Sequence, residues 1–312
     1  MNILYIFTLS LLSTFLCNNE SLQATSNQQT NKTKPSNRLQ FKNPEKINFD
    51  RLKALFNVEM PETTKKYYTE VDRGAKRVID GWFDKRIIIL LLLINKFQED
   101  HSIKGNVGEI GVWQARSFIP LMHLIKNDEQ ALAVDCFELY EFNRDKSGGI
   151  YPKSYGTYLF NQFMKNVTKY CSNTDTLEII KGDSAQLKPV DLLRPMKNGK
   201  KFRIFSVDGC HEAHSTAVDM NNAFQCLENG GVITIDDYFH PTWPGVSEGT
   251  NTFMQSNADA LKPFLIAWDR VFFAHTAYAQ QYFDYFKNVF IPKDVQTKMF
   301  FGVNVLIYDP IP

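Results

Sequence analysis

Between residues 106 and 235, short apolar runs alternate with longer segments in which apolar residues recur at helical spacing. The runs cover residues 106–110, 131–135, 177–180, 202–207 and 232–235, and none shows the polar–apolar alternation of a strand with one exposed face. Helical patterns separate them at 117–125, 155–170, 188–195 and 214–227. Because apolar strands that alternate with helices are typical of parallel sheets covered on both faces, the sequence predicts a doubly wound α/β domain.

Length, charge and cysteine content narrow the class of protein. A chain of 312 residues suits one large α/β domain or two small ones. Its formal net charge of +1, without a long run of one sign, argues against binding to nucleic acid or to an anionic membrane. The five cysteines contain no CxxC pair, so the sequence favours free thiols over a zinc site or a disulfide framework.

The N-terminal part differs in composition from the rest. Residues 1–17 form an apolar stretch that is too short for a membrane span. They predict a signal peptide, although the n-region of the stretch contains no Lys or Arg. An uncleaved anchor and a chance pattern are the alternatives. Residues 18–48 are rich in Asn, Gln, Ser, Thr and Lys and predict a disordered linker. A functional leader implies a secretory or extracytoplasmic location, and without one the protein would be cytoplasmic.

Residues 49–99 predict a helical lead-in to the domain. Apolar side chains at Val78, Ile79, Trp82 and Phe83 recur at helical spacing, ahead of the apolar run 87–94. That run is flanked by charges and is too short to span a bilayer, so we expect a buried helix that packs on the domain. Residues 100–312 then form the main domain, with residues 270–274 and 298–308 as closing strands.

The first strand of the predicted sheet ends in a candidate ligand-binding turn. In an open parallel sheet, ligands bind beyond the carboxyl ends of the strands. Here this strand leads into Glu109 and Gly111, where a glycine lets a ligand approach the backbone. Ser117 is placed to cap the following helix. The turn lacks the GxGxxG spacing of a dinucleotide site, and an ordinary turn is the alternative.

The next two strands also end in acids. Asp135 stands where a carboxylate can accept both hydroxyls of a ribose. Asp183 and Ser184 follow Gly182 at the end of the third strand, where a short polar side chain can meet an adenine edge. Solvated loop residues are the alternative, but the equivalent positions on successive strands favour a nucleoside site.

The fourth and fifth strands carry the candidate chemistry. Asp208 ends one of them, and Asp236 and Asp237 end the other. Three carboxylates at neighbouring strand ends repel one another unless a positive charge lies between them, and a hard divalent cation, Mg²⁺, fits oxygen ligands. His211 is placed to act over the same crevice as a general base. Acids that merely cap a turn are the alternative for the Asp236–Asp237 pair.

Taken together, these stretches resemble class I S-adenosylmethionine-dependent methyltransferases, and most closely the subgroup of macrocin O-methyltransferase. The resemblance is carried by residues 105–117, 182–184, 207–211, 228–233 and 236–238, by the strand that ends in Asp135, and by the stretch 243–249. It implies a Rossmann-like, seven-stranded, mostly parallel sheet whose last two strands form a hairpin, one of them antiparallel. One departure concerns the cofactor loop, where the later glycine of the family is replaced in the region of Gln114 and Ala115.

The resemblance also implies roles for the strand-end residues. S-adenosylmethionine would bind at Glu109, Gly111, Ser117, Asp135 and Asp183, and Ser184 adjoins the last of these. Asp208, Asp236 and Asp237 would hold Mg²⁺, while His211 would remove the acceptor proton. We therefore expect an O-methyltransferase that acts on a hydroxyl of a small molecule or glycan. A methyltransferase fold that binds ligand without catalysis, or an extracellular interaction protein, is the alternative, and a homo-oligomer is left open.

Overall fold

A computed structural model describes residues 53–54, 57–73, 76–137, 154–290 and 295–308. The described residues belong to one compact unit that spans residues 36–312. The predicted signal peptide and most of the predicted linker precede this unit, and both lie outside the described residues.

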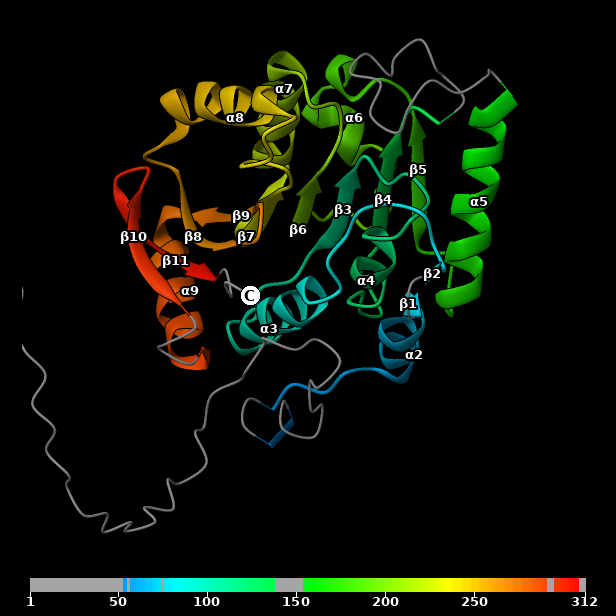
Figure 1. The fold of residues 1–312 in the computed structure, drawn as a ribbon, viewed down its shortest axis with the longest axis horizontal. Helices are drawn as coiled ribbons and strands as arrows, with labels where there is room; N and C mark the ends of the chain where they lie inside the picture. Colours follow the sequence, from blue (N-terminus) through cyan, green and yellow to red (C-terminus); the bar gives the residue numbers. More distant parts are fainter. Residues whose placement is uncertain (1–52, 55–56, 74–75, 138–153, 291–294, 309–312) are drawn as a thin grey trace, which may run out of the picture. The chain divides into compact units, whose positions relative to one another are not determined.

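A nine-stranded sheet forms the centre of the unit (Figure 1). Its order is β10-β11-β8-β9-β7-β6-β3-β4-β5. The strands are β3 (Asn106–Ile110), β4 (Ala131–Asp135), β5 (Leu177–Lys181), β6 (Phe202–Val207), β7 (Leu227–Ile235), β8 (Leu261–Ala267), β9 (Arg270–His275), β10 (Gln296–Phe300) and β11 (Val303–Tyr308). Strands β3 to β7 are parallel to one another, whereas β9 is antiparallel to both β7 and β8. The predicted doubly wound, mostly parallel α/β sheet is confirmed.

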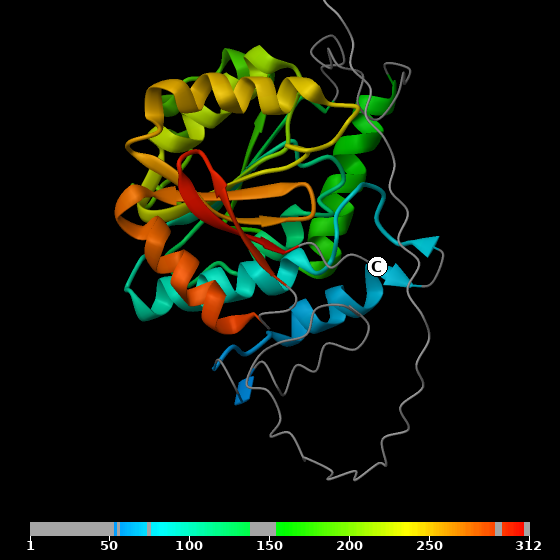
Figure 2. The same ribbon diagram turned by 60° about the vertical axis from the view of Figure 1, so that its left-hand side comes forward.

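Helices cover both faces of the sheet (Figures 1 and 2). One face carries α6 (Pro189–Leu193), α7 (Ala213–Gln225) and α8 (Pro244–Asn257), and the other carries α3 (Ile87–Asp100), α4 (Phe118–Met122), α5 (Ser154–Tyr170) and α9 (Thr276–Val289). A short 3₁₀ helix, Ser184–Gln186, follows β5. Neighbouring residues of one strand pack in different hydrophobic cores, one on each face of the sheet. In β4, Ala133 packs in one core and Val134 in the other, and in β6 Ile204 and Phe205 are divided in the same way. This double burial explains why the strand sequences are apolar throughout.

The predicted lead-in is only partly helical. It contains α2 (Glu62–Glu70), a short hairpin of β1 (Asp72–Arg73) and β2 (Lys76–Arg77), and then α3. Residues 78–83 are not helical, and the side chain of Trp82 is 69% exposed. The run Ile87–Ile94 is buried within α3, as expected, because this helix packs against the sheet.

Three further boundaries differ from the sequence prediction. Strand β8 was not expected, and residues 298–308 form two strands, β10 and β11, so nine strands replace seven. The hairpin with one antiparallel strand is β8–β9. Helix α7 ends at Gln225, whereas the helical pattern runs to residue 227. Strand β7 begins at Leu227, before the expected start at residue 232, and it contains Gly230 and Gly231 at an irregularity in its pairing with β6. This pairing absorbs the two glycines as a bulge.

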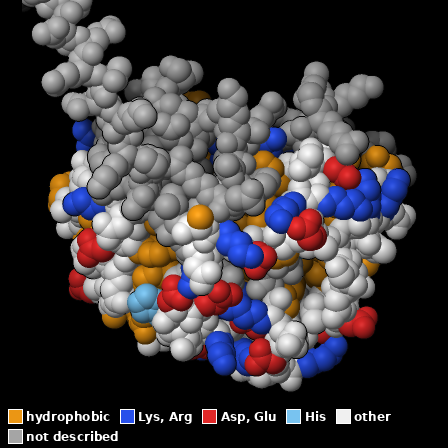
Figure 3. All heavy atoms as spheres, turned by 90° about the horizontal axis from the view of Figure 1, so that it is seen from below, with side chains coloured by type: hydrophobic (Ala, Val, Ile, Leu, Met, Phe, Trp, Pro, Cys, Tyr) orange, Lys and Arg blue, Asp and Glu red, His pale blue; other side chains and the backbone are white. Residues whose placement is uncertain are grey.

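The surface shows mixed charge. On the face drawn in Figure 3, acidic and basic side chains are interspersed, in line with the near-neutral net charge. Within the described ranges, no helix combines the length and apolar character needed to cross a bilayer.

Candidate functional site

The register of the sheet brings the predicted strand ends to one level. Ile110 pairs with Val207, and Val207 pairs with Ile235. The residues that follow these three, Gly111, Asp208 and Asp236, therefore lie side by side at the carboxyl edge of the sheet. A cavity of about 640 Å³ opens at this edge and is lined by nine of the ten predicted site residues. Glu109 is the exception, because its side chain is fully buried beneath the cavity.

Gly111 is required by the protein's own packing. Its φ is +86°, and a Cβ there would lie 1.7 Å from the carbonyl oxygen of Asp208. We had expected this glycine to admit a ligand. The structure shows that it also lets the ends of β3 and β6 approach one another, which sets the spacing of the site.

Replacing Gly111 with alanine should therefore lower the free energy of unfolding by more than about 2 kcal/mol. Gly199→Ala is the matched control, since Gly199 also has a positive φ, +67°, but no atom within 4 Å of its added Cβ. The control should cost about 1 kcal/mol. Urea denaturation compares the two variants. Equal losses would show that the approach of the two strand ends is not tight.

Glu109 and Ser117 form a buried pair beneath the cavity. Ser117 Oγ donates a hydrogen bond to Glu109 Oε1 over 2.5 Å, and the other carboxyl oxygen of Glu109 has no hydrogen-bond partner among the described residues. Burial raises the pKa of Glu109 from its usual 4.5 to about 8, although the Ser117 hydrogen bond acts in the opposite direction. Ser117 makes no side-chain hydrogen bond to the start of α4, so the predicted helix cap is wrong.

This raised pKa makes stability depend on pH. Glu109 stays protonated in the folded chain between pH 4.5 and 8, whereas the unfolded chain loses that proton. Its contribution to stability is therefore complete below pH 4.5 and is lost as the pH rises to 8. Relative to wild type, Glu109→Gln should gain about 3–4 kcal/mol between pH 5 and 8. Urea denaturation across this range measures the gain, and a constant difference would contradict the raised pKa.

Asp135 ties two loops together at the end of β4. Its carboxylate accepts hydrogen bonds from the backbone N–H of Trp113 (2.9 Å) and of Phe137 (2.8 Å). Burial raises the pKa of Asp135, and these two hydrogen bonds counteract the rise. Within the same loop, buried Ala115 has a φ of +72°. The alanine thus adopts the left-handed conformation that the family's glycine would favour.

Asp183 and Ser184 are each tied to neighbouring structure. Asp183 Oδ1 accepts from the backbone N–H of Ala185 over 3.1 Å and so caps the 3₁₀ helix. Ser184 Oγ donates to Asp219 Oδ2 over 3.0 Å, and Asp219 is buried on α7. Both residues still line the cavity. Asp219 therefore positions the loop after β5, a role that the sequence did not reveal.

A buried arginine lies among the strand-end acids. Arg270, the first residue of β9, is 4% exposed and forms an ion pair with Asp236. It also donates to Ser206 Oγ and Thr234 Oγ1, both at 3.2 Å. Burial alone would lower its pKa, but Asp236, Asp208 and Glu109 raise the pKa overall, so Arg270 stays charged. Part of the positive charge that we expected from a metal is thus supplied by the protein.

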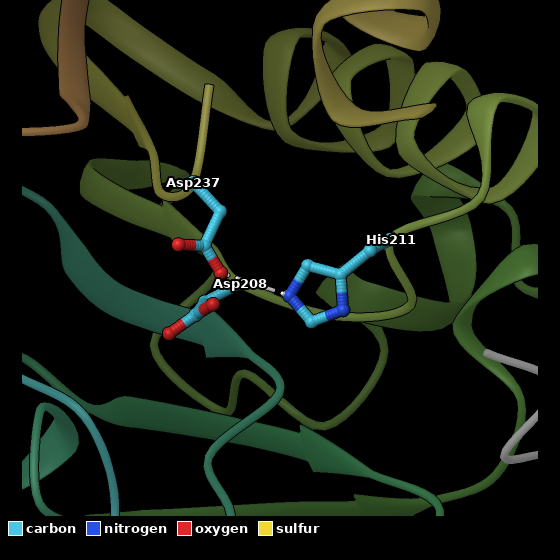
Figure 4. Close-up of side chains that lie close together, drawn as sticks. All are labelled: Asp208, His211 and Asp237. Atoms are coloured by element: carbon cyan, nitrogen blue, oxygen red, sulfur yellow. Dashed lines mark ion pairs between the residues drawn. The ribbon is translucent and has the colours of Figure 1, made fainter. Parts of the chain in front are cut away.

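The other two acids lie with the histidine. His211 Nε2 is 3.1 Å from Asp237 Oδ2, and Asp208 completes a cluster whose ligand atoms lie within 4.8 Å of one another (Figure 4). Burial raises the pKa of Asp208 well above its usual value, and Asp236 raises it further. The three predicted metal ligands are therefore divided: Asp208 and Asp237 face His211, while Asp236 is paired with Arg270.

The loop after β7 fixes the position of His211. The Trp243 ring stacks on the imidazole with centroids 4.5 Å apart and planes 20° apart. A Cβ on Gly245 would lie 2.4 Å from the His211 carbonyl oxygen, so only glycine allows α8 to begin against this backbone. The stretch 243–249 therefore serves to place the histidine.

Comparison with known families agrees with this arrangement. Residues 109–238 match a family model described as a methyltransferase domain. The match covers less than half of the chain, and it shows that the segment with the predicted site residues is similar to methyltransferase domains. The matched segment begins at Glu109 and ends at Tyr238, so it contains all ten predicted site residues. No curated protein sequence gives a significant match.

Solved structures are similar only at a low level. The O-methyltransferase NovP has 16% identity and a TM-score of 0.47, covering 61% of this chain and 80% of its own. CalS11, a TDP-rhamnose 3′-O-methyltransferase of calicheamicin biosynthesis, has 14% identity and a TM-score of 0.44. The match covers 68% of this chain and 93% of CalS11. TomG from Streptomyces achromogenes, an O-methyltransferase of tomaymycin synthesis, has 14% identity and a TM-score of 0.44. The match covers 73% of this chain and 95% of TomG. At these scores the similarity supports no statement about substrate.

Two residues at the cavity were missed in the sequence. Arg270 and Asp269 lie at the start of β9, and Asp269 comes within ligand distance of Asp236 and Asp237. Burial raises the pKa of Asp269, and the two neighbouring acids raise it further. Only the antiparallel direction of β9 carries these residues to the carboxyl edge of the parallel strands.

Proposed function

We propose that the protein transfers the methyl group of S-adenosylmethionine to a hydroxyl of a small molecule or sugar. The observation that carries the proposal is the His211–Asp237–Asp208 cluster, which adjoins a nucleoside-type crevice inside a methyltransferase domain. A base and two carboxylates beside the expected methyl donor suit the removal of a proton from an oxygen acceptor.

The residues at the ends of β3, β4 and β5 fit the cofactor. Asp135 accepts two backbone hydrogen bonds, which leaves lone pairs on its two oxygens for the hydroxyls of a ribose. The backbone is also open at Gly182, where an added Cβ would meet nothing within 4 Å. Both positions line the cavity. S-adenosylmethionine supplies an electrophilic methyl group on a sulfonium sulfur.

Asp208 and Asp237 are the residues that would hold Mg²⁺. They present carboxylate oxygens, the ligands that this ion prefers, within 4.8 Å of each other. Asp236 is the third candidate ligand: its Oδ2 is paired with Arg270, and the residue also lies within ligand distance of Asp237 and Asp269. When bound, the ion would lower the pKa of the acceptor hydroxyl.

The protein's own residues account for the proton. As the acceptor oxygen forms its bond to the methyl carbon, the carbon–sulfur bond breaks and its electron pair stays on sulfur. His211 accepts the hydroxyl proton at Nε2, the nitrogen that faces the two carboxylates (Figure 4). Asp237, 3.1 Å away, stabilises the imidazolium that results. Trp243 holds the ring in this orientation.

The proposal is tested by incubating the protein with S-adenosylmethionine and a panel of phenols and glycosides, followed by mass spectrometry. A gain of one methyl group on an oxygen acceptor, lost in chelator and restored by Mg²⁺, is the expected result. Full activity in chelator would contradict the metal assignment alone. Binding of S-adenosylmethionine without product from any acceptor would instead favour a catalytically inactive binding module.

A further inference from the structure

We propose that Asn166, a residue of α5, is a positioning residue for the turn that receives the methyl donor. This turn comprises residues 111–117, which follow β3, and we call it the cofactor turn. The inference rests on the proposed function, because it takes the cofactor turn as the place where S-adenosylmethionine binds. The cavity is lined by five of the seven residues of the turn: Gly111, Val112, Trp113, Arg116 and Ser117.

The cofactor turn contains two strained residues. Trp113 has a φ of +46° and Ala115 a φ of +72°, values that residues with a Cβ disfavour. Ala115 is fully buried, and glycine is the residue that adopts such a φ without cost. Strained conformations of this kind persist only where the surrounding structure holds them. The geometry of the turn therefore depends on its neighbours.

Asn166 bonds to the peptide unit next to the strained alanine. Its Nδ2 donates a hydrogen bond to the carbonyl oxygen of Gln114 over 2.9 Å. This carbonyl belongs to the peptide unit that joins Gln114 to Ala115, so its direction is coupled to the φ of Ala115. At the other end of the same unit, the N–H of Ala115 donates to the carbonyl oxygen of Val112 over 2.7 Å. A rotation of the unit that relaxed Ala115 would break both hydrogen bonds.

Other side chains hold other parts of the cofactor turn. Asp135 Oδ2 accepts from the backbone N–H of Trp113 over 2.9 Å, and the hydroxyl of Tyr67 donates to the carbonyl oxygen of Arg116 over 2.5 Å. Neither contact involves the peptide unit to which Asn166 donates. The hydrogen bond from Asn166 therefore acts on the strained torsion itself, whereas these two contacts fix the turn on either side of it.

Asn166→Ala should raise the Kd for S-adenosylhomocysteine about tenfold. Asn166 and Gln114 are 9% and 6% exposed, so the variant leaves a buried carbonyl without its donor. The turn would then relax, and the nucleoside would bind only the minor population that keeps the strained geometry. Asn166→Asp has nearly the same shape but no amide to donate, and it should weaken binding at least as much. Calorimetric titration of the full chain measures each Kd.

Ala115→Gly separates positioning from a general loss of stability. Glycine removes the cost of the positive φ, so the turn no longer depends on Asn166. Alone, Ala115→Gly should change the Kd by less than about twofold, but combined with Asn166→Ala it should restore the Kd to within about threefold of wild type. This non-additivity is the signature of a positioning role, because a purely structural hydrogen bond would not be replaced by a glycine in the cofactor turn.

Asn222→Ala is the matched control. Asn222 is also buried, and its Nδ2 donates to a loop carbonyl, that of Leu187, over 2.9 Å, but neither residue lines the cavity. This variant should lower the free energy of unfolding in urea without changing the Kd.

Three results would overturn the inference. They are a wild-type Kd for Asn166→Ala, a loss of affinity that Ala115→Gly does not restore, and an equal rise in the Kd for Asn222→Ala. The expected pattern of Kd values without methylated product from any acceptor would count only against the proposed transfer.

Discussion

Replacing His211 with glutamine should lower kcat by about 10²- to 10⁴-fold, the usual contribution of a general base. Glutamine can donate to Asp237, as the imidazolium would, but it cannot accept a proton from the acceptor hydroxyl. The affinity for S-adenosylmethionine should remain within about twofold, because His211 follows β6, apart from the strands that form the nucleoside crevice. Single-turnover kinetics and calorimetry measure the two quantities separately.

His214→Gln provides the matched control. His214 lies three residues after His211, at the start of α7. Its side chain is exposed and does not line the cavity. The control should keep both activity and cofactor affinity. If His211→Gln lost cofactor binding as severely as turnover, His211 would belong to the cofactor site and not to proton transfer.

Replacing Arg270 with methionine should destabilise the fold by about 3–5 kcal/mol, the typical cost of leaving a buried charge without its partner. The guanidinium is 4% exposed and lies against Asp236, with Asp208 and Glu109 in range of its charge. Without it, these acids repel one another unless they take up protons. The loss should therefore be smaller at acidic pH. Urea denaturation at neutral and acidic pH measures both effects.

Two comparisons make this result specific. Arg194→Met removes an ion pair with Asp191 in which the arginine side chain is 72% exposed, and it should cost less than about 1 kcal/mol. Combining Arg270→Met with Asp236→Asn should recover part of the lost stability, because one of the unpaired acids is removed. A cost for Arg270→Met no larger than that for Arg194→Met would show that the buried cation does not hold the acids together.

The parallel part of the fold could be predicted because its strands are buried on both faces. Each run from β3 to β7 is apolar without alternation, and the intervening helices have a separate periodicity. The C-terminal part could not be assigned as well. Strand β8 has an apolar run at residues 264–267, but Pro263, a residue that disfavours the interior of a sheet, stands directly before it. The turn at Phe301 and Gly302 divides what looked like one strand.

The lead-in shows how helical spacing can mislead. Val78 and Trp82 are four residues apart, yet both are exposed and neither lies in a helix. Their segment is shaped by tertiary contacts, from Arg116 to Ile79 and from Arg86 to Trp268. Partners this distant in sequence leave no local pattern. The part of the cavity lining that this segment supplies was therefore hidden from sequence analysis.

The site itself was predictable where a residue directly follows a parallel strand. Asp135, Asp183, Asp208 and His211 all line the cavity for this reason. Arg270 was missed because it begins a strand, and beginnings of strands reach this edge only when the strand is antiparallel. The charge argument had correctly required a cation among the acids. It could not show that the chain contributes one itself.

The most direct test of the account is calorimetric titration of the full chain with S-adenosylmethionine and S-adenosylhomocysteine, each with and without Mg²⁺. We expect saturable, one-site binding of both nucleosides, and binding that is lost in a variant carrying Asp135→Ala and Asp183→Ala. Absence of binding to either nucleoside by the folded wild-type chain would contradict the proposal that this cavity is a methyl-transfer site.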